Sequence, residues 1–220
     1  MAKLRKPLSR ERVLRTALKL ADRDGIESMS MRKLGDELGV EAMSLYNHVA
    51  NKDDLLDGLI DIVFGEIVVP PPSAGWRTAM RERAIAARKT LKKHPWALGV
   101  MESRRRPGPA NLRHHDGVLA ALRTDGFSVE MAAHAYSLLD AYIYGFTLNE
   151  LSLPLDTHEA VAGVAEQIFE ENPAGSYPYL AEVAADIVSK PGYDYGDEFE
   201  YGLDVILDGL NRARHREPPA

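Results

Sequence analysis

The stretch from Ser30 to Lys52, which reads SMRKLGDELGVEAMSLYNHVANK, constrains the fold of this chain more than any other part of the sequence. Ser30 is a favourable helix N-cap, because its hydroxyl can accept a hydrogen bond from a backbone N–H that has no partner inside the helix. A short amphipathic helix follows, and its apolar face carries Met31, Leu34 and Leu38. Gly39 is predicted to end this helix, because glycine readily adopts the left-handed conformation found at helix C-termini.

A second short helix is predicted from Glu41 to Val49, with Leu45 and Val49 placed to face a core. Two short helices joined by a tight turn with glycine form a helix-turn-helix, whose second helix has the size to enter the major groove of DNA. An ordinary pair of short core helices gives the same spacing, so the pattern alone leaves both interpretations open.

The residue identities favour the first interpretation. The sequence MRKLGDELGVEAMSLYNHVANKDDLLD, which begins at Met31, closely resembles the DNA-binding domain of the tetracycline-repressor (TetR) family of bacterial regulators. The resemblance covers residues 9–65, and its most specific part, LYNHVxNKxxLL, runs from Leu45 to Leu56. It implies a transcription factor. A helical enzyme with an incidental motif is the alternative, but the sequence has no Gly-rich phosphate loop, metal-spaced cluster or nucleophile elbow.

The charge distribution is uneven along the chain. The net charge is −6, yet residues 1–52 hold 11 basic and 7 acidic residues, a balance of +4, and the remainder carries −10. A basic head on an acidic body suits a protein that meets phosphate with one end only. Such a split also arises without a function, so it supports the motif but does not prove it.

The composition restricts the class and compartment of the protein. Cysteine is absent, which excludes disulfides, thiolate zinc sites and thiol redox sensing. No run approaches the ~18 apolar residues that a membrane helix needs, and no apolar signal-peptide core follows the basic N-terminus. The sequence therefore predicts a cytoplasmic protein without membrane contact. No strand pattern or repeat is found, so the predicted fold class is all-α, with about nine or ten helices.

Capping residues and proline breaks divide the chain into helices and domains. The prolines at positions 70–72 forbid a continuing helix, and the domain boundary is placed there. Residues 1–68 are predicted to form the helix-turn-helix DNA-binding domain with its connecting helix, and residues 69–220 a larger helical domain. Helices outside the motif are predicted at residues 9–24, 51–66, 75–93, 96–101, 111–123, 128–151, 156–171, 179–188 and 196–214.

Four residues are candidates for contacting base edges. Arg32, in the first turn of the first motif helix, can contact a guanine through O6 and N7. The resemblance gives this position a base contact, and a phosphate-binding or surface arginine is the alternative. Ala42 and Met43 begin the second helix, where base edges are usually read. Both lack hydrogen-bonding groups and offer only an apolar contact with a thymine methyl, so direct readout leans on Arg32 and Glu41.

The other DNA-binding candidates are polar side chains along one edge of the second helix and at its end: Ser44, Tyr46, Asn47, His48 and Lys52. The resemblance gives Tyr46, His48 and Lys52 phosphate-contacting roles, which position the duplex without specifying its sequence. Tyr46 as a core aromatic residue and His48 as a C-terminal helix cap are the alternatives.

The C-terminal part is predicted to serve dimerisation. The segment from Gly126 to Glu150, GFSVEMAAHAYSLLDAYIYGFTLNE, resembles the corresponding helix of the tetracycline-repressor branch. Its small residues allow close helix approach, and they are Ala132, Ala133, Ala135, Ala141 and Gly145. The resemblance implies that this helix and the final helix form a four-helix bundle between two subunits of a homodimer. A core within one subunit is the alternative.

The same domain is predicted to bind a small-molecule effector of unknown identity. Apolar area combined with a few polar groups is typical of such sites, and the candidates are Trp96, Met101, Arg106, Asn111, His115 and Tyr142. Each of them, taken singly, is also interpretable as structural. Arg106-Pro107 resembles a pocket-loop motif of the tetracycline branch, but Glu102 stands where that branch has a metal-ligating histidine. We therefore expect no metal, no cofactor and no magnesium-chelated ligand.

These features together predict a ligand-responsive transcriptional regulator, most simply a repressor, that binds a palindromic operator as a homodimer. Effector binding in the body is expected to tilt the connecting helix and to favour a state that fits DNA poorly. A DNA-binding protein without an effector is the remaining alternative, although it would have no need of the large body.

Overall fold

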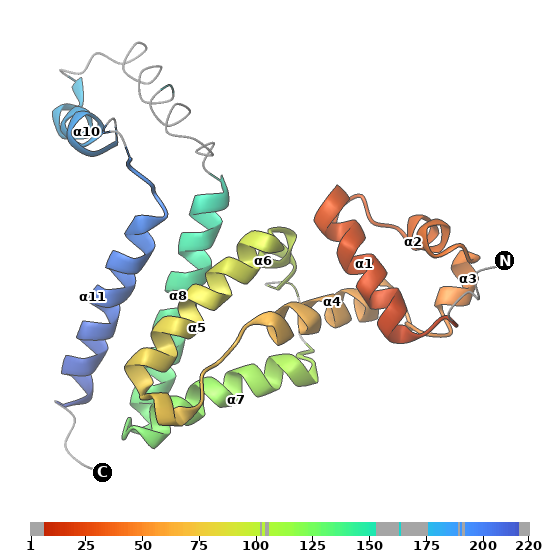
Figure 1. The fold of residues 1–220 in the computed structure, drawn as a ribbon, viewed down its shortest axis with the longest axis horizontal. Coiled ribbons are helices and arrows are strands. Elements are labelled where there is room, and N and C mark those ends of the chain that lie inside the picture. The colour runs from red at the N-terminus through yellow and green to blue at the C-terminus, as the bar shows by residue number, and fades with distance from the viewer. Residues whose placement is uncertain are drawn as a thin grey trace. The chain divides into compact units, whose positions relative to one another are not determined.

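The computed structural model describes residues 7–101, 103, 106–152, 163, 176–188, 190 and 192–215 (Figure 1). Within these residues there are ten α-helices and no strand, which confirms the all-α prediction. The predicted helix 156–171 apart from Gly163, Glu102 and the first six residues of the basic arm lie outside the described residues. The chain divides into two compact units, residues 1–143 and 144–219. The domain boundary near residue 68 stays a prediction.

Three helices form the N-terminal head: α1 (Arg10–Asp24), α2 (Met31–Leu38) and α3 (Ala42–Leu45). The predicted Ser30 cap is present, since its hydroxyl accepts the N–H of Lys33 at 3.2 Å. The Ser9 hydroxyl likewise accepts the N–H of Arg12 at 3.3 Å. A single apolar core joins the three helices to the start of the next one, and its most deeply buried members are Val13, Ala17, Leu34, Leu45, Val49 and Leu59. Burial of these side chains holds the head together.

The turn between α2 and α3 depends on two glycines. Gly39 ends α2 in the left-handed conformation, with φ 67° and ψ 39°, as predicted. A Cβ at Gly35 would lie 2.8 Å from the Val40 carbonyl oxygen, so only glycine lets the two helices approach this closely. The second motif helix is shorter than the predicted 41–49, because after Leu45 the chain continues in hydrogen-bonded turns and then extends into the Asn51 cap of the next helix.

The connecting helix α4 (Lys52–Glu66) begins at Asn51, whose side-chain oxygen accepts the N–H of Asp54 at 2.8 Å. Its N-terminal half packs in the head, where a Cβ at Gly58 would lie 2.6 Å from Leu14. The same helix contacts two helices of the body, α6 and α7. One helix of the first unit is therefore in contact with both the head and the body.

The body helices of the first unit follow the proline segment: η1 (Pro72–Ala74), α5 (Trp76–Lys93), α6 (Trp96–Met101), α7 (Pro109–Thr124) and α8 (Val129–Ser152). Ser128 caps α8, since its hydroxyl accepts the N–H of Met131 at 3.0 Å. Asp125 caps α5 across the fold by accepting the N–H of Trp76 at 2.6 Å. The start of α7 is two residues earlier than predicted, because Asp61 of α4 accepts the backbone N–H groups of Ala110 and Asn111.

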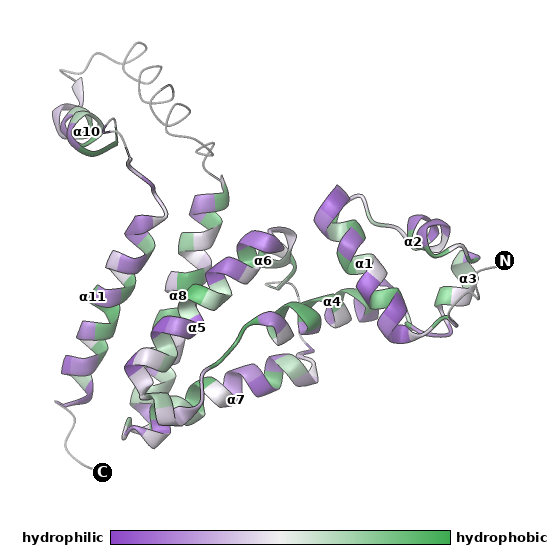
Figure 2. Ribbon diagram, viewed as in Figure 1, coloured by the Kyte–Doolittle hydropathy of each residue, from purple (hydrophilic) through white to green (hydrophobic). Residues whose placement is uncertain are grey.

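The second unit contains the end of α8 together with α10 (Pro178–Val183), the π-helical turn η3 (Ala184–Val188) and α11 (Asp197–Arg214). The Phe146 ring stacks on Tyr195 with centroids 4.9 Å apart and meets Phe199 edge-on at 5.2 Å. Bands of hydrophobic and hydrophilic residues mark α11 as amphipathic (Figure 2), and its buried residues are Phe199, Leu203, Leu207 and Leu210. No helix in the described part of the chain has the length and apolarity to cross a membrane.

Candidate nucleic-acid interface and interior polar cluster

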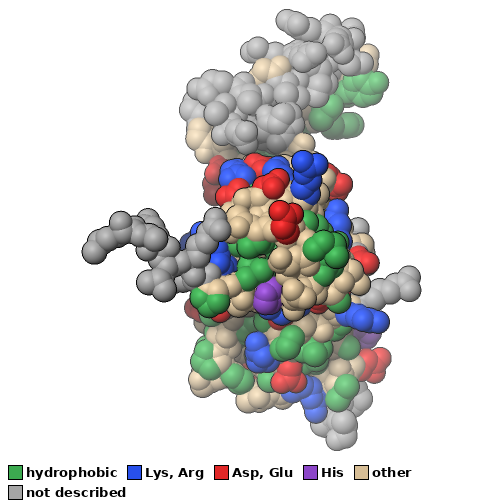
Figure 3. Space-filling view, turned by 90° about the vertical axis from the view of Figure 1, so that its right-hand side faces the viewer, with side chains coloured by type: hydrophobic (Ala, Val, Ile, Leu, Met, Phe, Trp, Pro, Cys, Tyr) green, Lys and Arg blue, Asp and Glu red, His purple; other side chains and the backbone are tan. Residues whose placement is uncertain are grey.

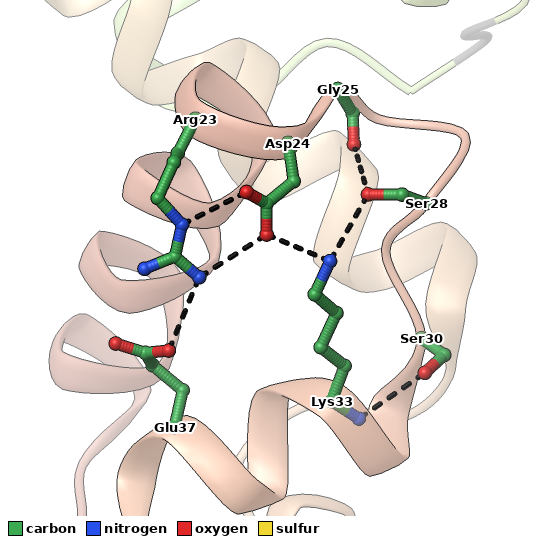
Figure 4. A network of polar contacts seen from close by, with 7 residues as sticks. All are labelled: Arg23, Asp24, Gly25, Ser28, Ser30, Lys33 and Glu37. Carbon is green, nitrogen blue, oxygen red and sulfur yellow. Dashed lines mark hydrogen bonds and ion pairs between the residues drawn. The ribbon is translucent and has the colours of Figure 1, made fainter.

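A polar network joins the end of α1 to α2 (Figure 4). Asp24 accepts from Arg23 at 2.9 Å and pairs with Lys33 at 2.7 Å, while Arg23 also reaches Glu37 at 3.3 Å. Hydrogen bonds from these two cations hold the pKa of Asp24 well below its usual range. The network therefore fixes the orientation of α2 on α1 and engages the ammonium group of Lys33 within the protein.

Arg32 is placed differently from its neighbour Lys33. It is exposed, and it makes no hydrogen bond or ion pair with any residue that the structure describes. Its guanidinium group is therefore available to a base edge or a phosphate, and it projects from a helix that the network has already oriented.

The predicted DNA-contacting residues of α3 and the following turn lie largely at the surface. Met43 is 75% exposed and Tyr46 is 44% exposed, whereas Leu45 and Val49 are buried, as predicted. This exposure argues against Tyr46 as a core aromatic residue. Glu41, Asn47 and Lys52 are also exposed, and Ala42, Ser44 and His48 are partly exposed. The face of the molecule on the side of the head shows basic, acidic and apolar side chains interspersed around a histidine (Figure 3).

An ion pair that the sequence reasoning missed secures the loop between α3 and α4. Arg10 pairs with Asp54 at 2.7 Å and also donates to the backbone carbonyl of His48 at 3.0 Å. Asp54 in turn accepts the N–H of Ala50 at 2.8 Å. The hydrogen bond from Arg10 lowers the pKa of Asp54, although burial acts against it. The loop that carries the phosphate-binding candidates is thus tied to α1.

The interior of the body contains a cluster of polar side chains from three helices. Arg83 of α5 is 0% exposed; its Nε donates to Nε2 of His114 at 3.2 Å, and its Nη2 pairs with Asp140. Nearby, the hydroxyl of Tyr136 lies 2.7 Å from Nδ1 of His115. We call Arg83, Asn111, His114, His115, Tyr136 and Asp140 the interior polar cluster.

The surroundings of the cluster set its protonation states. Burial, followed by the neighbouring Arg83 charge, lowers the pKa of His114 to about 3. Burial also lowers the pKa of His115 and raises the pKa of Tyr136. Both imidazoles and the phenol are therefore uncharged at pH 7, so the only charges in the cluster are those of the Arg83–Asp140 pair.

Three atoms of the cluster lack hydrogen-bond partners among the described residues: Nη1 of Arg83, Oδ1 of Asn111 and Nδ1 of His114. A buried polar atom without a partner costs about 1–3 kcal/mol, and more for a charged group. Such atoms are uncommon in folded proteins and call for an explanation, such as a bound group that completes them.

The structure brings two of the six predicted effector residues, Asn111 and His115, into the cluster. Trp96 lies elsewhere: its Nε1 donates to Asp22 at 2.8 Å, and it lines a cavity of about 450 Å³ together with Lys52. Arg106 lines a separate groove of about 860 Å³ beside α4. Met101 on α6 and Tyr142 on α8 are partly buried. The predicted set is thus divided among several places.

The sequence reasoning missed four members of the cluster: Arg83, His114, Tyr136 and Asp140. A signal was available for one of them. Arg83 lies at helical spacing from Ala79, Met80 and Ala87, which are all buried. A charged residue on the apolar face of a helix must have a buried partner, and this could have directed attention to an acidic residue on another body helix.

The connecting helix contacts the cluster region directly. The ring centroid of Phe64 lies 5.4 Å from that of His114 and 5.3 Å from that of His115. Asp61, one turn earlier, accepts the backbone N–H groups of Ala110 and Asn111 at 2.8 and 2.9 Å. This cap explains why α7 begins at Pro109 rather than at residue 111 as predicted.

A second link joins the head to the body through a buried imidazole. Nδ1 of His94, at the end of α5, lies 2.6 Å from Asp22 of α1, and its Nε2 lies 3.2 Å from Glu66 of α4. Lys93 also pairs with Glu66 at 2.7 Å. Three helices of the first unit therefore meet at His94.

Comparison with known proteins agrees with this organisation. Residues 13–59 match the family described as bacterial regulatory proteins, tetR family, and residues 69–214 match the tetracyclin repressor-like C-terminal domain. An HTH-type transcriptional regulator of Saccharopolyspora erythraea is 34% identical over 207 residues, covering 92% of this chain and 84% of the relative. The HTH-type transcriptional repressor DrrR1 of Streptomyces coeruleorubidus is 32% identical over 212 residues, covering 92% and 77%.

Solved structures give the same result. The Streptomyces coelicolor TetR family protein ActR, in complex with actinorhodin, matches with a TM-score of 0.80 and 32% identity, covering 95% of this chain and 99% of that one. The two family matches together span the elements from α1 to α11. The chain therefore belongs to the tetracycline-repressor family of DNA-binding helix-turn-helix regulators, which are not enzymes, and it carries a tetracycline-repressor-like C-terminal domain.

Proposed function

We propose that the protein is a homodimeric repressor that binds a palindromic operator and releases it when a small uncharged effector enters the interior polar cluster. The observation that carries this proposal is the position of α4. Its N-terminus follows the DNA-reading turn, and its C-terminal half touches the cluster through Phe64 and caps α7 through Asp61. A ligand that favours one position of α4 over another therefore also favours one position of the head, because α4 contacts both.

Two relatives support the regulatory direction and the effector. DrrR1 is named a transcriptional repressor, and ActR binds actinorhodin. Both are about one-third identical to this chain over nearly its whole length. We extend repression and ligand response to this protein on that similarity, together with the unpaired atoms of the cluster.

In the proposed complex, Arg32 donates hydrogen bonds to a base edge. Ala42 and Met43 make apolar contacts with a thymine methyl group. Tyr46, His48 and Lys52 bind phosphates, with Ser44 and Asn47 beside them and Glu41 at the start of the reading helix. The exposure of Arg32, Tyr46 and Lys52 supports these roles. Binding at the DNA places the protein in the cytoplasm.

The second copy is proposed to pack on α8 and α11. Both helices carry exposed large apolar residues, which on monomers are uncommon in groups. They are Leu138, Leu148 and Leu151 on α8, and Tyr201 and Val205 on α11. A two-fold dimer presents two reading helices to two half-sites of a palindrome.

Selection from random DNA duplexes with the purified protein tests the proposal. A palindromic consensus is expected. Arg32→Ala should relax the preference at one base pair of each half-site, whereas Lys52→Ala should weaken all sequences alike and reduce the salt dependence of binding. Lys92→Ala, an exposed change on α5, serves as the control. If the folded protein enriches no duplex at low salt, the proposal is wrong.

A further inference from the structure

A cavity of about 450 Å³ lies between the head and α6, and the proposed function leaves it unassigned. The head lines it with the loop after α1 and the first turns of α4, and the body lines it with α6 and the residues on either side. All of these residues belong to the first compact unit, and none of them belongs to the interior polar cluster. The volume falls within the ~300–1,000 Å³ range of small-molecule sites. A molecule bound there would contact the head and the body at once.

Part of the cavity wall is apolar and aromatic. Ile26 and Leu56 line it from the head, and both pack against the apolar core of the head, as Trp96 of α6 also does. The indole ring of Trp96 is fixed in orientation, because its Nε1 donates to Asp22 at 2.8 Å. The ring is only partly buried, so a face held in place offers a flat ligand a stacking surface at little cost in side-chain entropy.

Two opposite charges line the same cavity. Lys52 and Glu27 are both exposed, and neither side chain makes an ion pair or hydrogen bond with the other or with any further residue that the structure describes. An anionic ligand would be attracted by Lys52 but repelled by Glu27, and a cationic ligand would meet the reverse. A ligand that carries one charge of each sign can pair with both side chains.

We propose that this cavity is a second ligand site, which takes a small zwitterion with a planar aromatic body. The carboxylate of the ligand pairs with Lys52, its ammonium group pairs with Glu27, and its ring lies against Trp96. Because Lys52 is also a proposed phosphate contact, the bound carboxylate competes with DNA for it. This competition rests on the proposed function, whereas the site itself does not.

Three matched indoles test the charge requirement by calorimetry on the full-length protein without DNA. L-tryptophan carries both charges, tryptamine lacks the carboxylate, and indole-3-propionate lacks the ammonium group. Tryptophan is expected to bind about threefold to fivefold more tightly than either analogue, the effect of one partly exposed ion pair. Equal affinities for the three indoles, tighter binding of an analogue, or no binding of tryptophan would each overturn the inference.

Gly99 allows the location of the site to be tested. It lines the cavity within α6, and a Cβ at this position would meet no atom within 4 Å. Gly99→Leu is therefore expected to fill part of the cavity and to weaken tryptophan by at least about tenfold. It should not lower the melting temperature, because leucine is more favourable than glycine in a helix. Gly99→Ala, which adds one carbon, is the matched control and should retain binding. Unchanged affinity in Gly99→Leu would place the ligand elsewhere and contradict the proposal.

Charge variants assign the two ion pairs. Glu27→Gln is expected to weaken tryptophan and tryptamine but not indole-3-propionate, because only the first two carry the ammonium group. Lys52→Gln is expected to weaken tryptophan and indole-3-propionate but not tryptamine. Lys19→Gln, exposed on α1 and outside the cavity, is the control. If each variant affects the three indoles alike, the proposed pairs are wrong.

The competition with DNA is measured on the duplex obtained by selection. Saturating tryptophan is expected to reduce the slope of log affinity against log salt by about 0.9, the effect of one lost phosphate contact. Gly99→Leu should show no such reduction. An unchanged slope in the wild-type protein with tryptophan bound would refute the competition. If the wild-type protein binds no duplex at all, the proposed function fails, and the calorimetry alone decides on the site.

Discussion

The carboxylate of Asp61 on α4 accepts the backbone N–H of Asn111, the residue whose side-chain oxygen is unpaired in the interior polar cluster. A group bound to the Asn111 side chain would therefore contact the same residue whose backbone N–H is bonded to α4. The cap is close-fitting, since a Cβ at the adjacent Gly108 would collide with the Asp61 carboxyl group. Asp61 is thus a direct connection between the cluster and the helix that carries the head.

Asp61→Ala tests this connection. The change leaves two N–H groups of α7 without their acceptor and is expected to lower the free energy of unfolding by about 1–2 kcal/mol. Operator affinity without ligand should change little, because Asp61 lies in the half of α4 away from the reading turn. Ligand-induced release should be weakened more than ligand binding. The measurements are urea denaturation, operator titration and effector titration, with Asp57→Ala, one turn earlier on α4, as the comparison. Release that stays normal in Asp61→Ala would refute the connection.

His94→Ala addresses the second link between head and body. The imidazole is buried between Asp22 and Glu66, so its loss removes two hydrogen bonds to carboxylates and leaves a cavity. The expected decrease in the free energy of unfolding is about 2–4 kcal/mol, since hydrogen bonds to charged groups contribute about 1.5–3 each. His134→Ala, exposed on α8, is the matched control. A decrease no larger than that of the control would show that the link contributes little.

The low pKa of His114 predicts a pH dependence of stability. Because the folded-state pKa is about 3 and the ordinary value is 6.5, the unfolded chain binds the proton first as the pH falls. The contribution of neutral His114 to the free energy of unfolding is fully present above pH 6.5. It decreases as the pH falls toward 3, by up to about 1.4 kcal/mol per pH unit. His114→Gln, which keeps an acceptor for Arg83, should have a flatter curve in this window. The free energy of unfolding of both proteins is measured by denaturation at pH 7 and at pH 5. If the difference between wild type and variant is the same at the two pH values, the prediction is wrong.

Gly35→Ala should destabilise the head. The added Cβ would lie 2.8 Å from the Val40 carbonyl oxygen, which is backbone and cannot move without separating α2 from α3. A loss of about 1–3 kcal/mol, the range for overpacking a tight contact, is expected together with weaker operator binding. Gly209→Ala in α11 meets no atom within 4 Å and should instead stabilise by about 0.5–1 kcal/mol. If the two changes have the same sign, the explanation from close approach is wrong.

Much of the head was predictable because its determinants are local. Ser9, Ser30 and Asn51 each cap a helix that starts at the next residue, and Gly39 ends one, so a few neighbouring letters contain the whole interaction. The start of α7 was not predictable in this way, because its cap, Asp61, is supplied by a distant helix. Local rules identify a cap only when its acceptor is near in sequence.

The interior polar cluster was harder to foresee for the same reason. Arg83 and Asp140 are 57 residues apart, so the apolar face around Arg83 indicates that it needs a buried partner but not which residue supplies it. Asn111, His115 and Trp96 were predicted as effector residues on the same ground, apolar area combined with a few polar groups. The indole N–H of Trp96 is instead bonded to Asp22 of the head. Which polar residues are buried depends on hydrogen bonds and ion pairs with residues far away in the sequence.

The tie between Arg10, the His48 carbonyl and Asp54 has a kinetic consequence. It holds the loop after α3 in place in the free protein, with three hydrogen bonds of 2.7–3.0 Å to one guanidinium group. The conformational entropy of that loop is therefore lost during folding and not during the encounter with DNA. Operator association should accordingly proceed at a rate set by diffusion and electrostatic steering, without a slow ordering phase.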